Sequence, residues 1–258
     1  MKTILKSLGI AFLITLYFSC TEPKATTETE IVFNPEFEAV LDAYGDWQKW
    51  IDAKAMSYGM VHETNLTQES HYINLDSRKT RITSEYFEMG FDGEKTWISP
   101  NREAYSGKSI RFYHNLYFYF YSIPFVFTDP GVTVEKTEDK SLNGTLYPTF
   151  KVSFDNEIGD SPKDQYFMLI NPETNRLEYL LYTVTFYGTD NPTFNALKYE
   201  DYRDNDGIFI PRILTGYVYE NDSTKGIRYN VSFGDLLLLP EEFDSSIFEK
   251  PASGVYAD

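Results

Sequence analysis

The stretch from Arg111 to Pro130, RFYHNLYFYFYSIPFVFTDP, is the feature that most constrains how this chain can fold. Nine of its twenty residues are Phe or Tyr, and outside the N-terminal leader no other part of the chain is as apolar. A helix that is apolar on all sides must be buried or must face something other than water. We therefore predict a buried aromatic helix from Ser109 to about Ser122, broken near Pro124, with the rest of the chain forming a sheet around it.

The N-terminus has the layout of an export signal. Two lysines precede Leu8 to Phe18, a mostly apolar run that is too short to span a bilayer and fits the h-region of a signal peptide. The run ends at Ser19-Cys20, which resembles the lipobox of bacterial lipoproteins, although Tyr17 stands where that motif usually has Leu. This resemblance implies cleavage before Cys20 and acylation of its thiol. The alternative is an ordinary secretory signal followed by a chance cysteine.

Cys20 is the only cysteine, so the chain can form no internal disulfide and no cysteine-based metal site. The lipoprotein resemblance implies attachment to a membrane through acylated Cys20. In those proteins an Asp after the cysteine favours retention in the inner membrane, and this chain has Thr21 there. The resemblance therefore implies the outer membrane. The sequence does not decide between its periplasmic and its cell-surface leaflet. A formal net charge of −16 argues against a nucleic-acid partner.

Composition divides the chain into three parts. Residues 1–19 form the predicted lipoprotein signal peptide, and residues 20–32 form the acylated cysteine with a flexible tether rich in Thr and Glu. Residues 33–258 have the usual size of one β-rich domain, and the sequence contains neither an internal repeat nor an interdomain linker.

The domain is predicted to begin with an amphipathic helix. Asn34-Pro35 supplies an N-cap and a proline at the first helical position, and apolar residues follow at helical spacing to about Lys54. Gly45 lies inside this segment, where it costs about 1 kcal/mol relative to Ala, which indicates close backbone packing.

From Met56 onward the apolar residues alternate with period two, which predicts ten to twelve strands in consecutive hairpins. Many outward positions of these strands hold Tyr or Thr, as in a strongly curved sheet whose concave face meets helices or a ligand. The predicted strands are 56–64, 69–75, 79–86, 87–91, 95–99, 132–136, 145–154, 164–170, 176–187, 194–203, 208–220 and 227–233.

A lipobox, a tether, an initial helix carrying AYGDWQKW and a long antiparallel meander together resemble the LolA/LolB-like lipoproteins and lipoprotein carriers. The segments MGFDGEKTW, RFYHNLYFYFYSIPFVFTDPGV, INPETNRLEYLLYT and YEDYRDNDGIFIP resemble an uncharacterised family of bacterial lipoproteins more closely. The resemblance implies an α+β, mainly antiparallel fold, in which a strongly curved half-open barrel wraps two or three helices around a hydrophobic cavity. In the carriers that cavity takes lipoprotein acyl chains.

The aromatic stretch supplies the candidates for such a cavity, and the alternative is that these side chains are plain core. The candidate ligand-binding residues are Trp97, Phe112, Leu116, Tyr117, Phe120, Tyr121, Phe125 and Phe127.

Two other motifs have ordinary structural explanations. His62 and His71 fall on facing strands of the first predicted hairpin, where a metal pair is conceivable, but hydrogen-bonded or surface histidines explain them better. Asp201 to Gly207 resembles a calcium loop without the required spacing, and its Asp-Gly end suits a hairpin turn.

The sequence contains no complete phosphate loop and no common serine-nucleophile motif, so it predicts no catalytic residue, metal or cofactor. We therefore expect a non-enzymatic, lipid-anchored protein that binds a hydrophobic ligand such as the acyl chains of a lipid or lipoprotein. One alternative is a surface module that binds glycan or protein through exposed Tyr and Trp. A weaker alternative is a hydrolase that uses scattered carboxylates.

Overall fold

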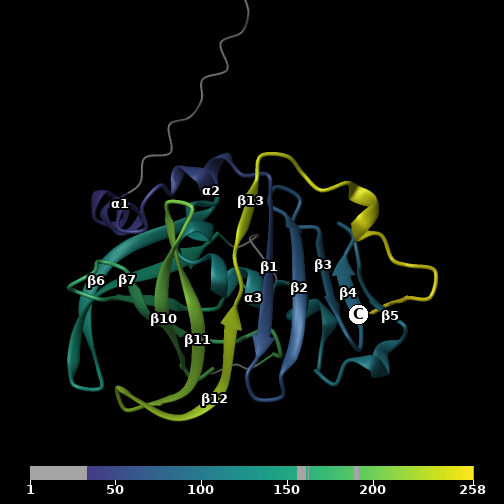
Figure 1. The fold of residues 1–258 in the computed structure, drawn as a ribbon. Helices are drawn as coiled ribbons and strands as arrows, with labels where there is room; N and C mark the ends of the chain where they lie inside the picture. Colours follow the sequence, from purple (N-terminus) through teal and green to yellow (C-terminus); the bar gives the residue numbers. More distant parts are fainter. Residues whose placement is uncertain (1–33, 156–160, 162, 189–191, 258) are drawn as a thin grey trace, which may run out of the picture. The chain divides into compact units, whose positions relative to one another are not determined.

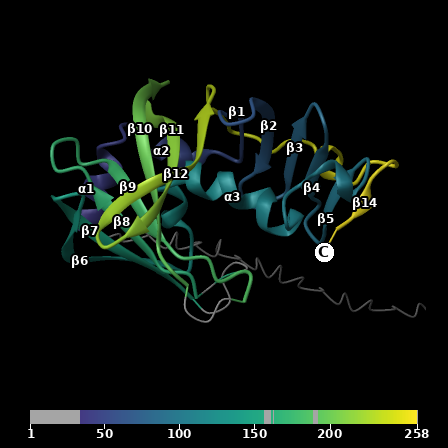
Figure 2. The same cartoon turned by 90° about the horizontal axis from the view of Figure 1, so that it is seen from below.

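The computed structural model describes residues 34–155, 161, 163–188 and 192–257. The predicted signal peptide, Cys20 and the tether lie outside the described residues, so acylation stays a prediction. Phe33–Asp258 forms one compact unit, shown in Figures 1 and 2.

This unit is built on a single antiparallel sheet, and hairpins connect most neighbouring strands (Figure 1). The order is β14-β5-β4-β3-β2-β1-β12-β11-β10-β9-β8-β7-β6, with β13 paired to β1 beside this path. The strands are β1 Ala55–His62, β2 Thr67–Asn74, β3 Thr80–Ser84, β4 Glu88–Phe91, β5 Thr96–Ser99, β6 Val132–Leu142, β7 Thr145–Phe154, β8 Tyr166–Ile170, β9 Leu177–Tyr182, β10 Asn195–Asn205, β11 Ile208–Glu220, β12 Ser223–Phe233, β13 Leu237–Leu239 and β14 Val255–Tyr256.

The sheet does not close on itself. In the described part of the chain, β14 and β6 stand at opposite ends of the strand order, and each pairs with only one neighbour. This open, mainly antiparallel sheet with few helices is consistent with the half-open curved barrel expected from the sequence.

The aromatic helix is confirmed. Helix α3 runs from Ile110 to Ser122, and the Ser109 hydroxyl caps it by accepting a hydrogen bond from the Phe112 amide. Helix α3 packs against β3, β4 and β5 and lies along one face of the sheet (Figure 2). The predicted break at Pro124 is also present, and a 3₁₀ turn, η2, follows at Phe125–Thr128. Two more 3₁₀ turns are η1, Arg102–Ala104, and η3, Ser245–Phe248.

The prediction of one continuous N-terminal helix to about Lys54 is wrong. Two short helices form instead, α1 at Pro35–Asp42 and α2 at Gln48–Asp52. The chain breaks at Gly45, whose φ of +86° lies in the left-handed region that favours glycine. A β-bridge from Gly45 to Ile208 replaces the helical hydrogen bonds there, so the predicted close packing is present and itself interrupts the helix.

The strand prediction also needs correction at the ends of the chain and on β9. The described residues contain fourteen strands, because the apolar tail pairs with β1 as β13 and the last residues pair with β5 as β14. Strand β9 ends at Tyr182 rather than at Tyr187. The residues after Tyr182 turn toward α3, where Phe186 and Tyr187 contact the Phe112 ring.

The main core lies between α3 and the sheet. Phe118 on α3 is fully buried, and Phe37 and Leu41 on α1 join the same cluster of apolar side chains. Within the described residues, no helix is both long enough and apolar enough to cross a membrane.

Candidate functional site

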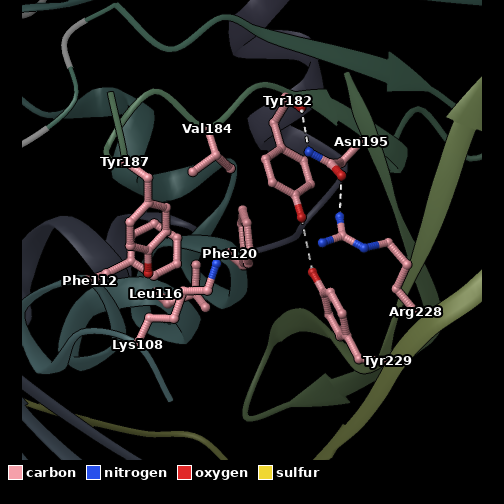
Figure 3. Close-up of a pocket in the computed structure, with 10 residues that line it drawn as sticks. All are labelled: Lys108, Phe112, Leu116, Phe120, Tyr182, Val184, Tyr187, Asn195, Arg228 and Tyr229. Carbon is pink, nitrogen blue, oxygen red and sulfur yellow. Dashed lines mark hydrogen bonds between the residues drawn. The ribbon is translucent and has the colours of Figure 1, made fainter. Parts of the chain in front are cut away.

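A cavity of about 330 Å³ opens between α3, the end of β9, the start of β10 and the middle of β12 (Figure 3). This volume lies within the usual range for small-molecule sites, roughly 300–1,000 Å³. Its lining residues are Lys108, Phe112, Leu116, Phe120, Tyr182, Val184, Tyr187, Asn195, Arg228 and Tyr229.

One face of α3 supplies the apolar wall. Phe112, Leu116 and Phe120 follow each other at intervals of four residues, which places them on the same side of a helix. Phe120 is buried and its ring contacts that of Tyr182, with 4.9 Å between the centroids. Phe112 and Leu116 are only half-buried, so part of their apolar surface remains available.

The opposite wall is polar but uncharged at depth. The hydroxyls of Tyr182 and Tyr229 lie 3.2 Å apart, and Arg228 donates a hydrogen bond to the Asn195 side-chain oxygen (Figure 3). Burial raises the pKa of both Tyr182 and Tyr229, so these hydroxyls stay neutral. The wall can therefore hydrogen-bond a ligand without supplying a nucleophile.

The cavity contains three of the eight candidate residues, namely Phe112, Leu116 and Phe120. Trp97 is fully buried on β5, where its indole nitrogen donates to the Phe248 carbonyl at 2.7 Å. It lines a different part of the core.

The remaining four candidates are also buried away from the cavity lining. Tyr117 contacts the rings of His62, Tyr113 and Tyr229. Tyr121 stacks on Phe233, with 4.0 Å between the ring centroids. Phe125 stacks on Trp50, and Phe127 contacts Phe154 and Tyr166.

Seven lining residues were missed by sequence reasoning. Tyr182 carried a weak signal, because it is one of the Tyr residues at outward strand positions. Lys108 and Arg228 carried none, since nothing in a single sequence brings the segment before α3 next to β12. The residues not predicted are Lys108, Tyr182, Val184, Tyr187, Asn195, Arg228 and Tyr229.

A second polar cluster lies beneath α3, around the buried carboxylate of Glu69. Tyr113 donates to this carboxylate at 2.8 Å, and His71 Nε2 lies 2.9 Å from its other oxygen. His62 Nε2 lies 3.3 Å from Glu69 and 2.8 Å from the Tyr113 hydroxyl. Because a carboxylate only accepts, His71 Nε2 carries the hydrogen. The Nδ1 atom of the same ring lies 3.1 Å from the Tyr58 hydroxyl.

The two predicted hairpin histidines are therefore hydrogen-bonded partners of a buried acid. Burial alone would raise the pKa of Glu69, but hydrogen bonds and charge from His62 and His71 outweigh it and lower the pKa to about 2. Across the described residues, no three His, Cys, Asp or Glu side chains are grouped so that they could hold a metal ion. The cluster fixes Tyr113 of α3 to β2.

The Asp201–Gly207 segment ends in the predicted turn, because Asp201–Asn205 complete β10 and Asp206-Gly207 connect it to β11. The Asp204 carboxylate accepts from the Gly207 amide at 2.7 Å, and Gly207 has a φ of +86°. Asp206 pairs with Lys49 at 3.0 Å.

Residues 10–221 match a family described as a family of unknown function (DUF6503). The chain belongs to this family. The match covers the aromatic stretch and all of the cavity except its β12 residues. No curated protein matches the chain.

Solved structures agree with the fold. The chain is similar to a LolA superfamily protein from Nitrosomonas europaea, with a TM-score of 0.50, 10% identity, and coverage of 83% of this chain and 97% of that one. It is also similar to a DUF1329 family protein from Desulfovibrio piger, with a TM-score of 0.48, 9% identity, and coverage of 83% and 96%. The likeness to the LolA superfamily protein, at such low identity, concerns the fold alone, and that fold is LolA-like.

Proposed function

We propose that this DUF6503 protein binds the acyl chain of a lipid or lipoprotein in the cavity beside α3, without catalysing a reaction. We further propose that it acts in the cell envelope, anchored to the outer membrane through acylated Cys20. The single observation that carries the binding proposal is the cavity of about 330 Å³ with Phe112, Leu116 and Phe120 along one wall. The LolA-like fold and the Ser19-Cys20 lipobox resemblance support the envelope setting.

The size of the cavity sets the scale of the ligand. If a methylene group takes about the 30 Å³ that a water molecule takes in the liquid, the cavity holds on the order of ten carbons. Burying each methylene contributes about 0.8 kcal/mol. About 8 kcal/mol of gross apolar burial must exceed an association cost of at least about 4 kcal/mol. The difference is at most about 4 kcal/mol, so we expect a dissociation constant of about 1 mM.

A cavity-filling substitution tests this proposal. Because Phe33–Asp258 is a compact unit of its own, the chain from Thr21 onward can be prepared without the anchor and titrated with 1-decanol by calorimetry. Leu116→Trp places a larger side chain in the half-buried wall and should weaken decanol binding at least tenfold. Leu146→Trp is the matched control, since Leu146 is 61% exposed on β7 and does not line the cavity.

Thermal unfolding of both variants shows whether each remains folded. Decanol binding by folded Leu116→Trp with the affinity of the unsubstituted chain would place the ligand elsewhere. If the unsubstituted chain binds no decanol, the acyl-chain proposal fails, and the glycan- or protein-binding module becomes the next hypothesis to test.

A further inference from the structure

The cavity that carries the proposed function has a polarity gradient. Its deepest residues, Phe120 and Tyr182, are 4% and 5% exposed. The two basic side chains that line it, Lys108 and Arg228, are both exposed. Figure 3 places Lys108 beside the Phe112 wall and Arg228 on the strand side. The interior is thus apolar or neutral, whereas the rim carries two positive charges.

Among the described residues, neither of these two cations has an acidic partner. The Lys108 ammonium lies 5.6 Å from the centre of the Tyr187 ring, and Arg228 donates to the neutral Asn195 side chain. Neither forms a salt bridge with any described residue. By contrast, eight other Lys and Arg side chains of the described segments do: Lys49, Lys54, Arg78, Arg81, Lys136, Lys198, Arg203 and Arg212.

The positive charge of the rim is opposite in sign to the net charge of the whole chain. A chain with a formal net charge of −16 repels anions over much of its surface. Two positive charges at one cavity mouth, with no carboxylate partner in the described part of the chain, locally reverse that preference. The guanidinium of Arg228 has five N–H donors in a planar fork, which can hold a carboxylate or phosphate with two parallel hydrogen bonds.

We propose that the ligand is a single-chain amphiphile whose acyl chain, on the order of ten carbons, fills the cavity and whose anionic head group is held at the rim by Lys108 and Arg228. The head group is a carboxylate or a phosphate attached to the chain, because the apolar interior and the cationic rim belong to one cavity. This inference rests on the proposed function and adds to it the charge class of the ligand.

The test compares ligands that share a ten-carbon chain and differ only at the head. The chain from Thr21 onward is titrated with decanoate, decyl phosphate, 1-decanol and decyltrimethylammonium. The two anions should bind about three- to tenfold more tightly than decanol, the range that two exposed ion pairs supply. Decyltrimethylammonium should bind more weakly than decanol. The advantage of the anions should shrink between 50 and 500 mM NaCl because salt screens exposed charges.

Two variants assign this preference to the rim. The double variant Lys108→Gln, Arg228→Gln should lose the preference for decanoate over decanol, so the ratio of the two affinities falls to about one. Lys151→Gln is the matched control, because Lys151 is an exposed lysine on β7 that does not line the cavity. It should keep the full preference for the anion.

The outcomes separate the two proposals. Equal binding of decanoate and decanol, or an unchanged preference in the double variant, would overturn the anionic-head inference and leave acyl-chain binding intact. Binding of no ten-carbon ligand would overturn the proposed function itself. Inorganic phosphate is titrated alone as well, and if it binds as tightly as decyl phosphate, the rim is a site for free anions and the inference is overturned.

Discussion

The backbones of Gly45 and Gly207 meet so closely that a Cβ atom added to Gly45 would lie 2.4 Å from the Gly207 carbonyl oxygen. The same oxygen accepts a hydrogen bond from the Asp46 amide at 2.9 Å. This contact joins the break between α1 and α2 to the β10–β11 turn, and Lys49 reinforces it by pairing with Asp206. The N-terminal helices are therefore held to the sheet by backbone atoms at a point where only glycine fits.

Gly45→Ala should lower the free energy of unfolding by at least about 2 kcal/mol, because alanine is strained at a φ of +86° and its methyl group meets backbone. Urea unfolding followed by tryptophan fluorescence measures this loss. Gly226→Ala is the matched control, since no atom lies within 4 Å of its added Cβ. An equal effect of the two substitutions would contradict the contact.

Glu69 should make stability depend on pH in the acid range. Its pKa falls from 4.5 to about 2 on folding, so between these values the unfolded chain binds more protons than the folded one. The contribution is fully present above about pH 4.5 and is lost as the pH falls through 2. At about 1.4 kcal/mol per pKa unit it is of order 3 kcal/mol. Unfolding free energies measured from pH 7 to pH 3 test this prediction.

Substitution of the same residue isolates that contribution. Glu69→Gln should lower the free energy of unfolding at pH 7 by about 1–3 kcal/mol. The two histidines and Tyr113 then no longer have a charged carboxylate as hydrogen-bond acceptor. The difference from the unsubstituted chain should narrow as the pH falls. Glu38→Gln, at an exposed position on α1, should match the unsubstituted chain throughout. A constant gap between Glu69→Gln and the unsubstituted chain would show that Glu69 does not titrate as described.

Removing the hydroxyl of two neighbouring tyrosines should have opposite effects. The rings of Tyr58 and Tyr121 lie 4.9 Å apart, and both are buried. The Tyr121 hydroxyl has no hydrogen-bond partner among the described residues, so Tyr121→Phe should stabilise the protein by up to about 1 kcal/mol. Tyr58→Phe removes a hydrogen bond to His71 and should destabilise it by about 1 kcal/mol. The thermal unfolding midpoints of the two variants measure these effects. If both midpoints shift in the same direction, the predicted difference between the two hydroxyls is wrong.

Trp97 should matter for stability and not for ligand binding. Trp97→Phe removes buried volume and the hydrogen bond to the Phe248 carbonyl, and should cost about 2–4 kcal/mol. Decanol affinity, measured on the folded fraction at low temperature, should stay within twofold because Trp97 does not line the cavity. If Trp97→Phe binds decanol much more weakly but is as stable as the unsubstituted chain, Trp97 takes part in ligand binding.

The aromatic helix could be predicted from local features alone. Ser109 supplies a cap, the apolar residues extend over more than three turns, and Pro124 ends the segment, so no distant contact is needed to form α3. The hairpins were equally local, because Asp92-Gly93 and Asp206-Gly207 encode their turns. The break at Gly45 was not local, since only the approach of Gly207 reveals why the helix stops there.

The sequence by itself determined an aromatic helix, an antiparallel meander and the apolar character of their contact. It could not determine which face of α3 borders a cavity, because a helix that is apolar all round carries no periodicity to choose between Phe120 and Tyr121. Tertiary structure decided this by packing Tyr121 onto Phe233 and leaving Phe112, Leu116 and Phe120 beside the cavity residues of β9, β10 and β12. The charged rim arose in the same way, since sheet pairing brings β12 next to β11 and β1 and thereby carries Arg228 to the cavity that Lys108 also lines.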